Sequence, residues 1–310
     1  MQIKKYISIV FATMIIVGLF QSCTPPPKPA EQAPKQLNIS VMIDISDRID
    51  PIKNPAMPSY SERDLAIIKE LITAFRNDMQ TLGTWNSKGR FRVFMEPSPT
   101  IANIDMLQKE LVVDCSTMDV SQKKQIYDNM ESKFITALQE IYSETTTKGG
   151  YADGSDIWRF FKEDVKDYCI SSDENYRNIL VILTDGYIYQ KGNNEKNGKR
   201  VQNLIGSTIN KYRSAANPIN AIDNDDFGLI TSRNDLQNLE VLVLEIAPDK
   251  NHSQKDEEIL KYCIGKWLKE MGISHYAVYK SDLPTKTVQR IHSFINQKPQ
   301  SEDDIDTTIG

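Results

Sequence analysis

The sequence predicts an α/β fold with a doubly wound, mostly parallel central sheet that is flanked by helices. Short apolar runs rich in Ile, Val and Leu alternate with longer segments of helical periodicity along the chain. Some of these runs are nearly continuous, which is typical of parallel strands that helices cover on both faces. Because strands and helices alternate, we expect right-handed crossovers that place helices on either side of one sheet.

Five segments have the composition of strands, since apolar and β-branched residues fill them and turn residues bound them. The first, third and fourth of these are the nearly continuous runs, so we expect helices on both of their faces. In chain order the five strands are 37–46, 90–96, 178–186, 239–248 and 274–280.

Helical segments lie between the strands. The first has apolar residues at helical spacing, with Ser61 at a capping position and Gly83 as its terminating residue,. The expected helices are 61–83, 121–144, 155–169, 256–272 and 283–296, with a weaker one near 198–213.

The amino-terminal segment has the pattern of an export signal. Lys4 and Lys5 precede an apolar run that is too short to span a bilayer comfortably,. Cys23 follows a small residue, an arrangement that resembles a relaxed bacterial lipobox. We therefore expect a signal peptide at 1–22, an acylated Cys23, and a lipid-anchored protein in the cell envelope, with the outer membrane favoured. An ordinary secretory signal with an incidental cysteine is the alternative.

The rest of the chain predicts a tether, one domain and a tail. A proline-rich stretch at 23–36 is expected to form an extended tether, the domain spans 37–296, and the acidic tail at 297–310 is expected to be disordered,. The net charge is −5 and no basic run occurs, which argues against nucleic acid as a partner,. Whether any two of the remaining cysteines form a disulfide stays open; they are Cys115, Cys169 and Cys263.

Two connections are longer than a doubly wound fold requires. They are 47–60 after the first strand and 187–236 after the third. Both leave the carboxyl ends of strands, which is the edge where open α/β sheets bind their ligands. Extra length at this edge indicates a functional role.

Polar side chains gather in the sequence where these strands end. If the strand and loop ends meet at one edge, they place several oxygen ligands together. Hard divalent cations such as Mg²⁺ prefer a set of oxygen ligands of this kind. The residues concerned are Asp44, Ser46, Ser155, Asp156 and Asp185.

These residues resemble the metal-ion-dependent adhesion site of von Willebrand factor type A (vWA) domains. Asp44 and Ser46 match the start of the family's D-x-S-x-S pattern, Ser155 after a glycine stands in for its threonine, and Asp185 in "LVILTDG" matches its last ligand. The resemblance covers roughly 37–290. It implies a vWA-like fold, Mg²⁺ or another divalent cation as cofactor, and a binding module that engages an envelope protein.

One residue departs from that pattern. Arg48 stands where the family has its second serine, and a guanidinium cannot coordinate a cation,. If Arg48 points inward, it could pair with Asp44 or Asp185 and replace the metal. If it points outward, a partial site of four oxygen ligands survives. Both outcomes stay open at this stage.

The interpretation has two competitors. Aspartates after strands commonly accept hydrogen bonds in turns, so Asp44 and Asp185 could be structural. The same edge could also serve a metal-assisted or aspartate-dependent phosphohydrolase with Asp44 as nucleophile. However, that strand ends in D-x-S where such enzymes have D-x-D, and no nucleophile elbow, H-E-x-x-H helix or P-loop occurs,. We therefore expect a non-catalytic protein that serves in binding or envelope assembly.

Overall fold

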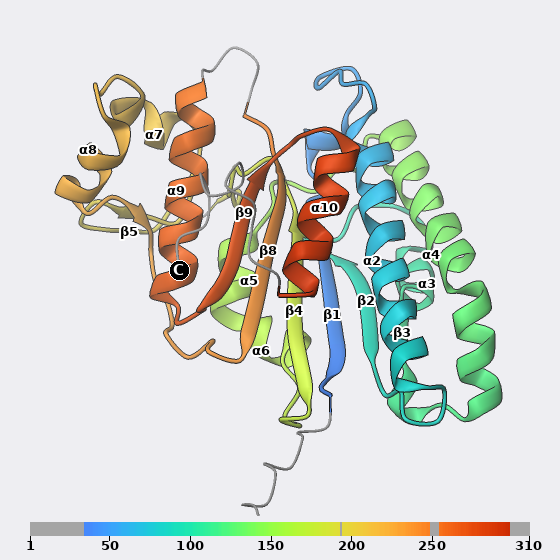
Figure 1. Cartoon of the computed structure of the whole chain (residues 1–310). Helices are drawn as coiled ribbons and strands as arrows, with labels where there is room; N and C mark the ends of the chain where they lie inside the picture. Colours follow the sequence, from blue (N-terminus) through green and yellow to red (C-terminus); the bar gives the residue numbers. More distant parts are fainter. Residues whose placement is uncertain (1–33, 193, 249–253, 298–310) are drawn as a thin grey trace, which may run out of the picture. The chain divides into compact units, whose positions relative to one another are not determined.

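The computed structural model describes residues 34–192, 194–248 and 254–297. Its centre is a six-stranded sheet with the order β3-β2-β1-β4-β8-β9 (Figure 1). Neighbouring strands are parallel except for β3, which pairs antiparallel with β2. The strands are β1 (Gln36–Ile43), β2 (Arg90–Met95), β3 (Val112–Asp114), β4 (Tyr176–Leu183), β8 (Leu239–Ile246) and β9 (His275–Lys280). The expected doubly wound α/β fold, with its mostly parallel sheet, is confirmed.

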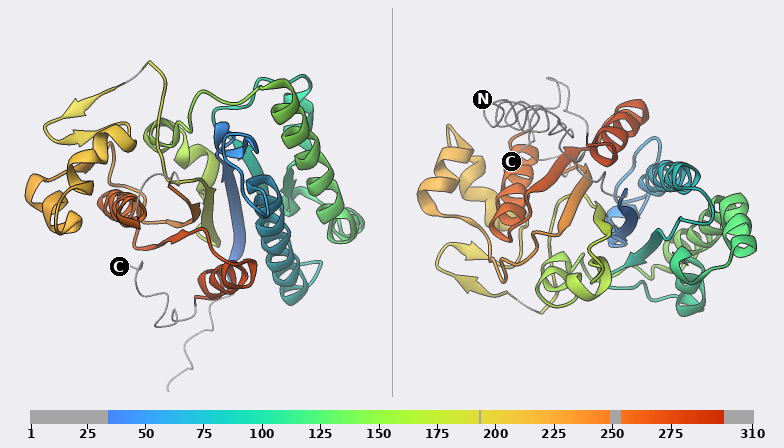
Figure 2. Two further views of the ribbon diagram at one scale, coloured as in Figure 1. Left: turned by 90° about the horizontal axis from the view of Figure 1, so that it is seen from above. Right: turned by 60° about the horizontal axis from the view of Figure 1, so that its bottom comes forward.

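Helices cover both faces of the sheet (Figures 1 and 2). Successive side chains of a strand point to opposite faces, so Val41 packs into one core and Met42 into the other,. One face carries α2 (Tyr60–Leu82), α3 (Ile104–Glu110), α4 (Val120–Lys148) and α10 (Pro284–Ile295). The other carries α5 (Ile157–Glu163), α6 (Val165–Cys169) and α9 (Gln254–Glu270).

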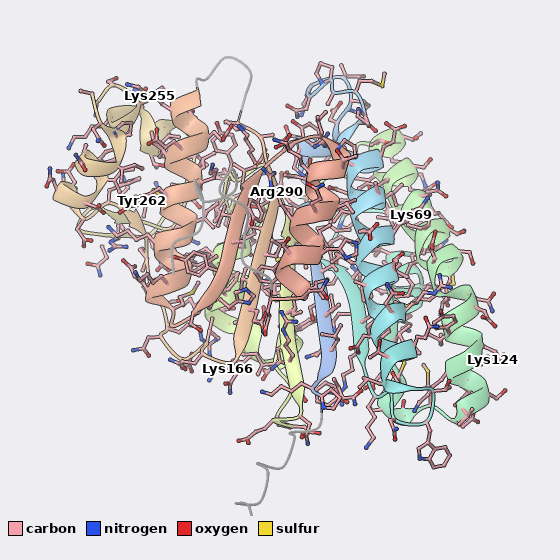
Figure 3. The ribbon with its side chains drawn as sticks, in the orientation of Figure 1. Lys69, Lys124, Lys166, Lys255, Tyr262 and Arg290 are labelled. Carbon is pink, nitrogen blue, oxygen red and sulfur yellow. The ribbon has the colours of Figure 1, made fainter. Side chains whose placement is uncertain are left out.

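The outer faces of these helices are polar. Lys69 of α2 and Lys124 of α4 are exposed (Figure 3). The opposite faces of the same helices supply buried side chains such as Phe75 and Phe134. This amphipathic pattern is the reason the segments were recognisable as helices in the sequence.

Some helix ends differ from those expected. Ser59, and not Ser61, caps α2, because Glu62 N donates to the Ser59 hydroxyl at 3.3 Å and Ser59 N donates to the Glu62 carboxylate at 2.8 Å. This capping box satisfies two backbone donors at once. The segment 155–169 forms two helices with a break at Asp164, and only its residues from Ile157 onward are helical.

The connection 187–236 is an ordered unit rather than a plain loop. It contains a small sheet with the order β5-β6-β7 and two short helices. The weaker helix expected near 198–213 is confined to the second half of that range. The elements are β5 (Lys196–Asn197), β6 (Arg200–Val201), α7 (Gly206–Arg213), α8 (Pro218–Asp225) and β7 (Gly228–Leu229).

Several predictions concern residues outside the described part. These are the signal peptide at 1–22, the acylation of Cys23, nearly all of the tether, and the tail beyond residue 297. The tether ends earlier than expected, since Gln36 already belongs to β1. Within the described residues, no helix combines the length and apolarity that crossing a membrane requires. The cysteines of the domain are buried and free: Cys115, Cys169 and Cys263.

Candidate functional site

The order of the strands singles out one position at the edge of the sheet. From β1 the chain adds β2 and β3 on one side, and from β4 it adds β8 and β9 on the other. Ligands of open α/β sheets bind outside the carboxyl ends of the strands at such a point of reversal. Asp44 directly follows β1, and Asp185 follows β4 after one intervening residue. Both aspartates therefore lie at the position that the topology marks.

Asp44 is buried, and hydrogen bonds hold both its main chain and its carboxylate. Its backbone amide donates to the carbonyl of Leu183 at 2.9 Å, which continues the pairing of β1 with β4. The Thr184 hydroxyl donates to Oδ2 at 2.8 Å, and the amide of Ser46 donates to Oδ1 at 3.1 Å. The carboxylate of Asp44 thus contacts the residue that immediately precedes Asp185.

Asp185 interacts electrostatically with Asp44. Burial, and next the negative charge of Asp44, raise the pKa of Asp185 to about 7. The amide of Tyr187, which donates to Asp185 Oδ1 at 2.9 Å, and the charge of Arg48 act in the opposite direction. Asp185 Oδ2 accepts no hydrogen bond from the residues that the structure describes. The structure thus brings the two carboxylates together at one rim.

The hydroxyls of the two serines of the predicted site form hydrogen bonds with backbone groups of the loops that follow β1 and β4. Ser46 is partly buried, and its hydroxyl accepts the amide of Arg48 at 3.4 Å. Ser155 is buried, and its hydroxyl donates to the carbonyl of Tyr187 at 3.0 Å. Because Ala152 also donates to the carbonyl of Ile45 at 3.3 Å, this loop joins the ends of β1 and β4.

The loop that carries Ser155 depends on a glycine. Gly154 has φ +98°, and an added Cβ would stand 2.2 Å from the carbonyl oxygen of Tyr189,.

Asp156, in contrast, does not join the site. Its Oδ2 accepts from Arg159 Nε at 2.6 Å and from the amide of the Gln190 side chain at 3.1 Å. The sequence-based expectation that Asp156 belongs with the other oxygen ligands is therefore wrong.

Arg48 points inward, but its partner is neither of the expected carboxylates. Its Nη2 lies 2.5 Å from Asp64 Oδ2, and both side chains are almost completely buried. The Tyr142 hydroxyl donates to the same oxygen at 2.8 Å, and Arg48 Nε donates to the main-chain carbonyl of Asp44 at 3.3 Å. Asp64 of α2 therefore takes up the guanidinium charge, and the side chain of Arg48 forms no ion pair with Asp44 or Asp185.

Burial acts against the charged form of Asp64. It raises the pKa of this carboxyl to about 6, although Arg48 and the Tyr142 hydroxyl both favour the ionised form. The guanidinium remains protonated, since its pKa is raised. One nitrogen of Arg48, Nη1, and one oxygen of Asp64, Oδ1, are buried without a hydrogen-bond partner in the described part of the chain.

Sequence reasoning missed Asp64 and Thr184. A signal for Asp64 was present, because it lies at helical spacing before Ile68, Leu71 and Phe75 on the buried stripe of α2. A carboxylate on such a stripe requires a cationic or hydrogen-bonding partner. Thr184 had no comparable signal, since only the register of β1 against β4 places its hydroxyl on Asp44.

The donor set fits a hard divalent cation. Asp44 and Asp185 interact at this rim, Ser46 follows Asp44 in the same loop, and the positive charge of Arg48 is paired with Asp64. Oxygen ligands of this kind are typical for Mg²⁺ and Ca²⁺. No group of three or more His, Cys, Asp or Glu that could hold a metal ion occurs in the described ranges. Any cation here would thus depend on hydroxyl or water ligands besides the two carboxylates.

Comparisons with known proteins give distant structural matches. No protein-family model matches the chain, and no curated protein sequence matches it either. Among solved structures, the pilus adhesin SpaC from Lactobacillus rhamnosus GG is 12% identical with a TM-score of 0.40, over 86% of this chain and 30% of the adhesin. Its open conformation has 12% identity and a TM-score of 0.37, over 85% of this chain and 29% of the adhesin. The chain thus spans less than a third of these structures, and we rest no conclusion on the matches.

Proposed function

We propose that this chain is a lipid-anchored, vWA-like binding module of the cell envelope, which engages a partner protein through the carboxyl edge of its sheet. Mg²⁺ or another divalent cation is held there by Asp44 and Asp185, with Ser46 and Ser155 beside them. The module is non-catalytic. The observation that carries the proposal is the meeting of the two carboxylates at the point where the strand order reverses.

The charges at this edge support a cation. Burial is the largest cause of the raised pKa of Asp185, and repulsion by the carboxylate of Asp44 raises it further,. A divalent cation would replace this repulsion with attraction to both groups. The charge of Arg48 lowers the pKa of Asp185, but Arg48 pairs with Asp64, so it offsets the repulsion only in part. The substitution of arginine for a ligand serine is therefore compatible with a retained cation site.

Calorimetric titration of Mg²⁺, Mn²⁺ and Ca²⁺ into the full chain tests the cation site. We expect binding by the natural sequence and by Arg48→Ser, and loss of binding by Asp185→Asn. Asp47→Asn is the matched control, since Asp47 is an exposed carboxylate of the same loop that pairs with Lys53. If the natural sequence binds no cation and Arg48→Ser does, the arginine blocks the site and our account of Asp64 is wrong.

Partner binding is tested by pull-down from envelope extract in Mg²⁺ and in chelator. We expect a partner that is retained in Mg²⁺ and lost with Asp185→Asn, whereas Asp47→Asn retains it. Unchanged partners for all variants would contradict a role for this edge. The same preparations test the alternative: phosphoester turnover that disappears in Asp44→Asn would show an enzyme instead of a binding module.

The lipid anchor is tested separately. The lipobox-like pattern before Cys23 supports it, and that residue lies outside the described part of the chain. We expect Cys23→Ser to abolish labelling by a fatty-acid analogue and to release the protein from the membrane fraction. Labelling that persists in this variant would refute Cys23 as the attachment site, and absence of labelling in the natural sequence would refute the anchor and leave an ordinary exported protein.

A further inference from the structure

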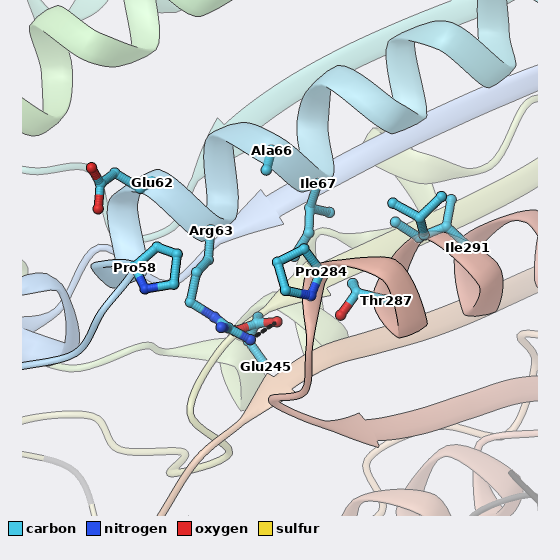
Figure 4. A pocket seen from close by; sticks show the side chains of 10 residues that line it. Pro58, Glu62, Arg63, Ala66, Ile67, Glu245, Pro284, Thr287 and Ile291 are labelled. Carbon is cyan, nitrogen blue, oxygen red and sulfur yellow. Dashed lines mark hydrogen bonds and ion pairs between the residues drawn. The ribbon is translucent and has the colours of Figure 1, made fainter. Parts of the chain in front are cut away.

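A small apolar pocket lies between the first turns of α2 and α10 (Figure 4). Its volume is about 70 Å³. This is about half of the roughly 150 Å³ of a dry apolar cavity that binds benzene, so a branched aliphatic side chain fits it. Its apolar wall consists of Pro58, Ala66, Ile67, Pro284, Val288 and Ile291.

Arg63 and Glu245, which both line this pocket, neutralise each other. Arg63 donates to both carboxylate oxygens of Glu245, at 2.5 and 3.1 Å, and to the carbonyl of Asp282 at 2.7 Å. The Ser281 hydroxyl also donates to Glu245 at 3.0 Å. Figure 4 shows this ion pair beside the apolar wall. Since Arg63 and Glu245 satisfy each other, the pocket favours an uncharged, apolar group.

Two exposed apolar residues directly precede residues that line the pocket. Met57 is 95% exposed and directly precedes Pro58, while Leu283 is 65% exposed and directly precedes Pro284. Single exposed apolar residues are ordinary on a protein surface, but an apolar cavity with large apolar residues on two sides marks an interaction surface. These residues precede α2 and α10 and follow β1 and β9, so they belong to the same carboxyl edge as Asp44.

Glu62 adds a charge at the edge of the pocket. Its side chain is exposed and accepts hydrogen bonds from Ser59, which hold the pKa of this carboxyl below its usual range. Glu62 forms no ion pair with any residue in the described ranges, unlike neighbouring Arg63 with Glu245. In Figure 4 its carboxylate is turned away from that pair. The pocket is thus apolar inside and carries a negative charge at its rim.

We infer that this pocket anchors the partner protein: a segment of the partner inserts a branched aliphatic side chain between α2 and α10 and places a Lys or Arg beside Glu62. The inference rests on the proposed function, because it describes the partner that the carboxyl edge binds. A buried anchor surrounded by a polar rim is the usual design of a protein interface. Charge complementarity at the rim sets the orientation of the segment.

The inference can be tested by phage display. Short random peptides are selected for binding to the full chain. We expect the enriched peptides to share a Leu, Ile or Val with a Lys or Arg nearby. Ala66→Trp fills the mouth of the pocket, and we expect it to weaken binding about tenfold or more. Ala66→Glu is a second variant at the same exposed helical position. Gln289→Trp, on an exposed position of α10 outside the pocket, is the control and is expected to bind as the natural sequence does.

Glu62→Gln tests the charge at the rim. We expect weaker binding of the same peptides and a smaller loss of affinity when salt is added. Urea denaturation of each variant verifies that the fold is retained. Enriched peptides with acidic or aromatic anchors, peptides indifferent to both Ala66 variants, or no enrichment over an unrelated protein would each overturn the inference.

The variant Asp185→Asn distinguishes a failure of the pocket as anchor from a failure of the proposed function. Peptides that require Asp185 but bind both Ala66 variants normally would refute the pocket as anchor, while the proposal that the carboxyl edge binds a partner would remain valid. Peptides that require the pocket but neither Asp185 nor a divalent cation would refute the cation-dependent part of the proposed function alone.

Discussion

The buried ion pair between Arg48 and Asp64 makes a strong prediction about stability. The two side chains are 1% and 0% exposed, and the Tyr142 hydroxyl shares the same carboxylate oxygen. Removing one partner of such a pair leaves a buried charge without compensation, which typically costs about 3–5 kcal/mol. We expect a loss of this size in the free energy of unfolding of Asp64→Ala. Against a typical total of about 5–15 kcal/mol, this is a large fraction of the stability.

A double-mutant cycle measured by urea denaturation tests the reasoning. Replacing both partners by apolar residues, as in Arg48→Met with Asp64→Leu, removes the charges together and is expected to be nearly neutral or stabilising. The sum of the two single losses should therefore exceed the double loss by nearly the whole of that sum. Single variants that lose less than about 1 kcal/mol and add up in the double variant would refute the buried pair.

The exposed pair of the same loop is the matched control. Lys53 Nζ and Asp47 Oδ2 lie 3.0 Å apart, with both side chains 59% exposed. Exposed ion pairs contribute about 0–1 kcal/mol, so Asp47→Asn should change little. A loss in Asp47→Asn as large as that in Asp64→Ala would show that burial is not the cause.

The pH dependence of Arg48→Met provides a further check. Without the guanidinium, the pKa of Asp64 rises above its value of about 6, and therefore further above its ordinary value of 3.8,. The folded state then binds the proton more tightly than the unfolded state does. Stability must consequently fall as the pH rises from the ordinary pKa through the raised one. We expect Arg48→Met to lose less stability near pH 5 than near pH 8.

Three more predictions follow from the site and the cysteines. In chelator, Asp185→Asn removes a carboxyl whose pKa is raised from 3.8 to about 7. Urea denaturation should therefore find this variant more stable than the natural sequence near pH 8, and its advantage should be about 3 kcal/mol smaller near pH 5. Equal pH profiles would contradict the raised pKa. Gly154→Ala forces a Cβ towards the carbonyl of Tyr189 and displaces Ser155. Calorimetry should therefore show weaker cation binding, and urea denaturation should show a loss of about 1–3 kcal/mol in the free energy of unfolding. Normal cation binding would exclude Ser155 from the site. The buried cysteines of the domain are Cys115, Cys169 and Cys263. A thiol reagent should label them in urea but not in the native protein, and rapid labelling of the native protein would contradict their burial.

The central strands could be predicted because their apolar, β-branched composition is compatible with few other kinds of secondary structure. β1, β4 and β8 have 8 residues each and consist mostly of apolar residues, and such strands become buried when helices cover both faces of a sheet. β3 was missed because its 3 residues provide no periodic pattern. It forms only through antiparallel pairing with β2, which is a contact between distant parts of the chain.

The candidate site could be predicted in part. Asp44 and Asp185 were recognisable because each follows an apolar strand, and the carboxyl ends of parallel strands share one edge,. The exclusion of Asp156 could not be foreseen, because its partner Arg159 lies one helical turn further on and could equally have faced solvent. The pocket beside Glu62 was not predictable, since α2 and α10 are separated by most of the domain.

The sequence by itself determined the class of the fold and the edge on which its polar residues lie, because apolar periodicity and strand ends are local properties of the chain. Tertiary structure alone decided that Arg48 pairs with Asp64, and that Asp44 lies close enough to Asp185 for its charge to raise the pKa of that residue. The physical reason is that a buried charge takes whichever opposite charge the packing of β1 against α2 brings within reach, and local sequence does not specify that choice.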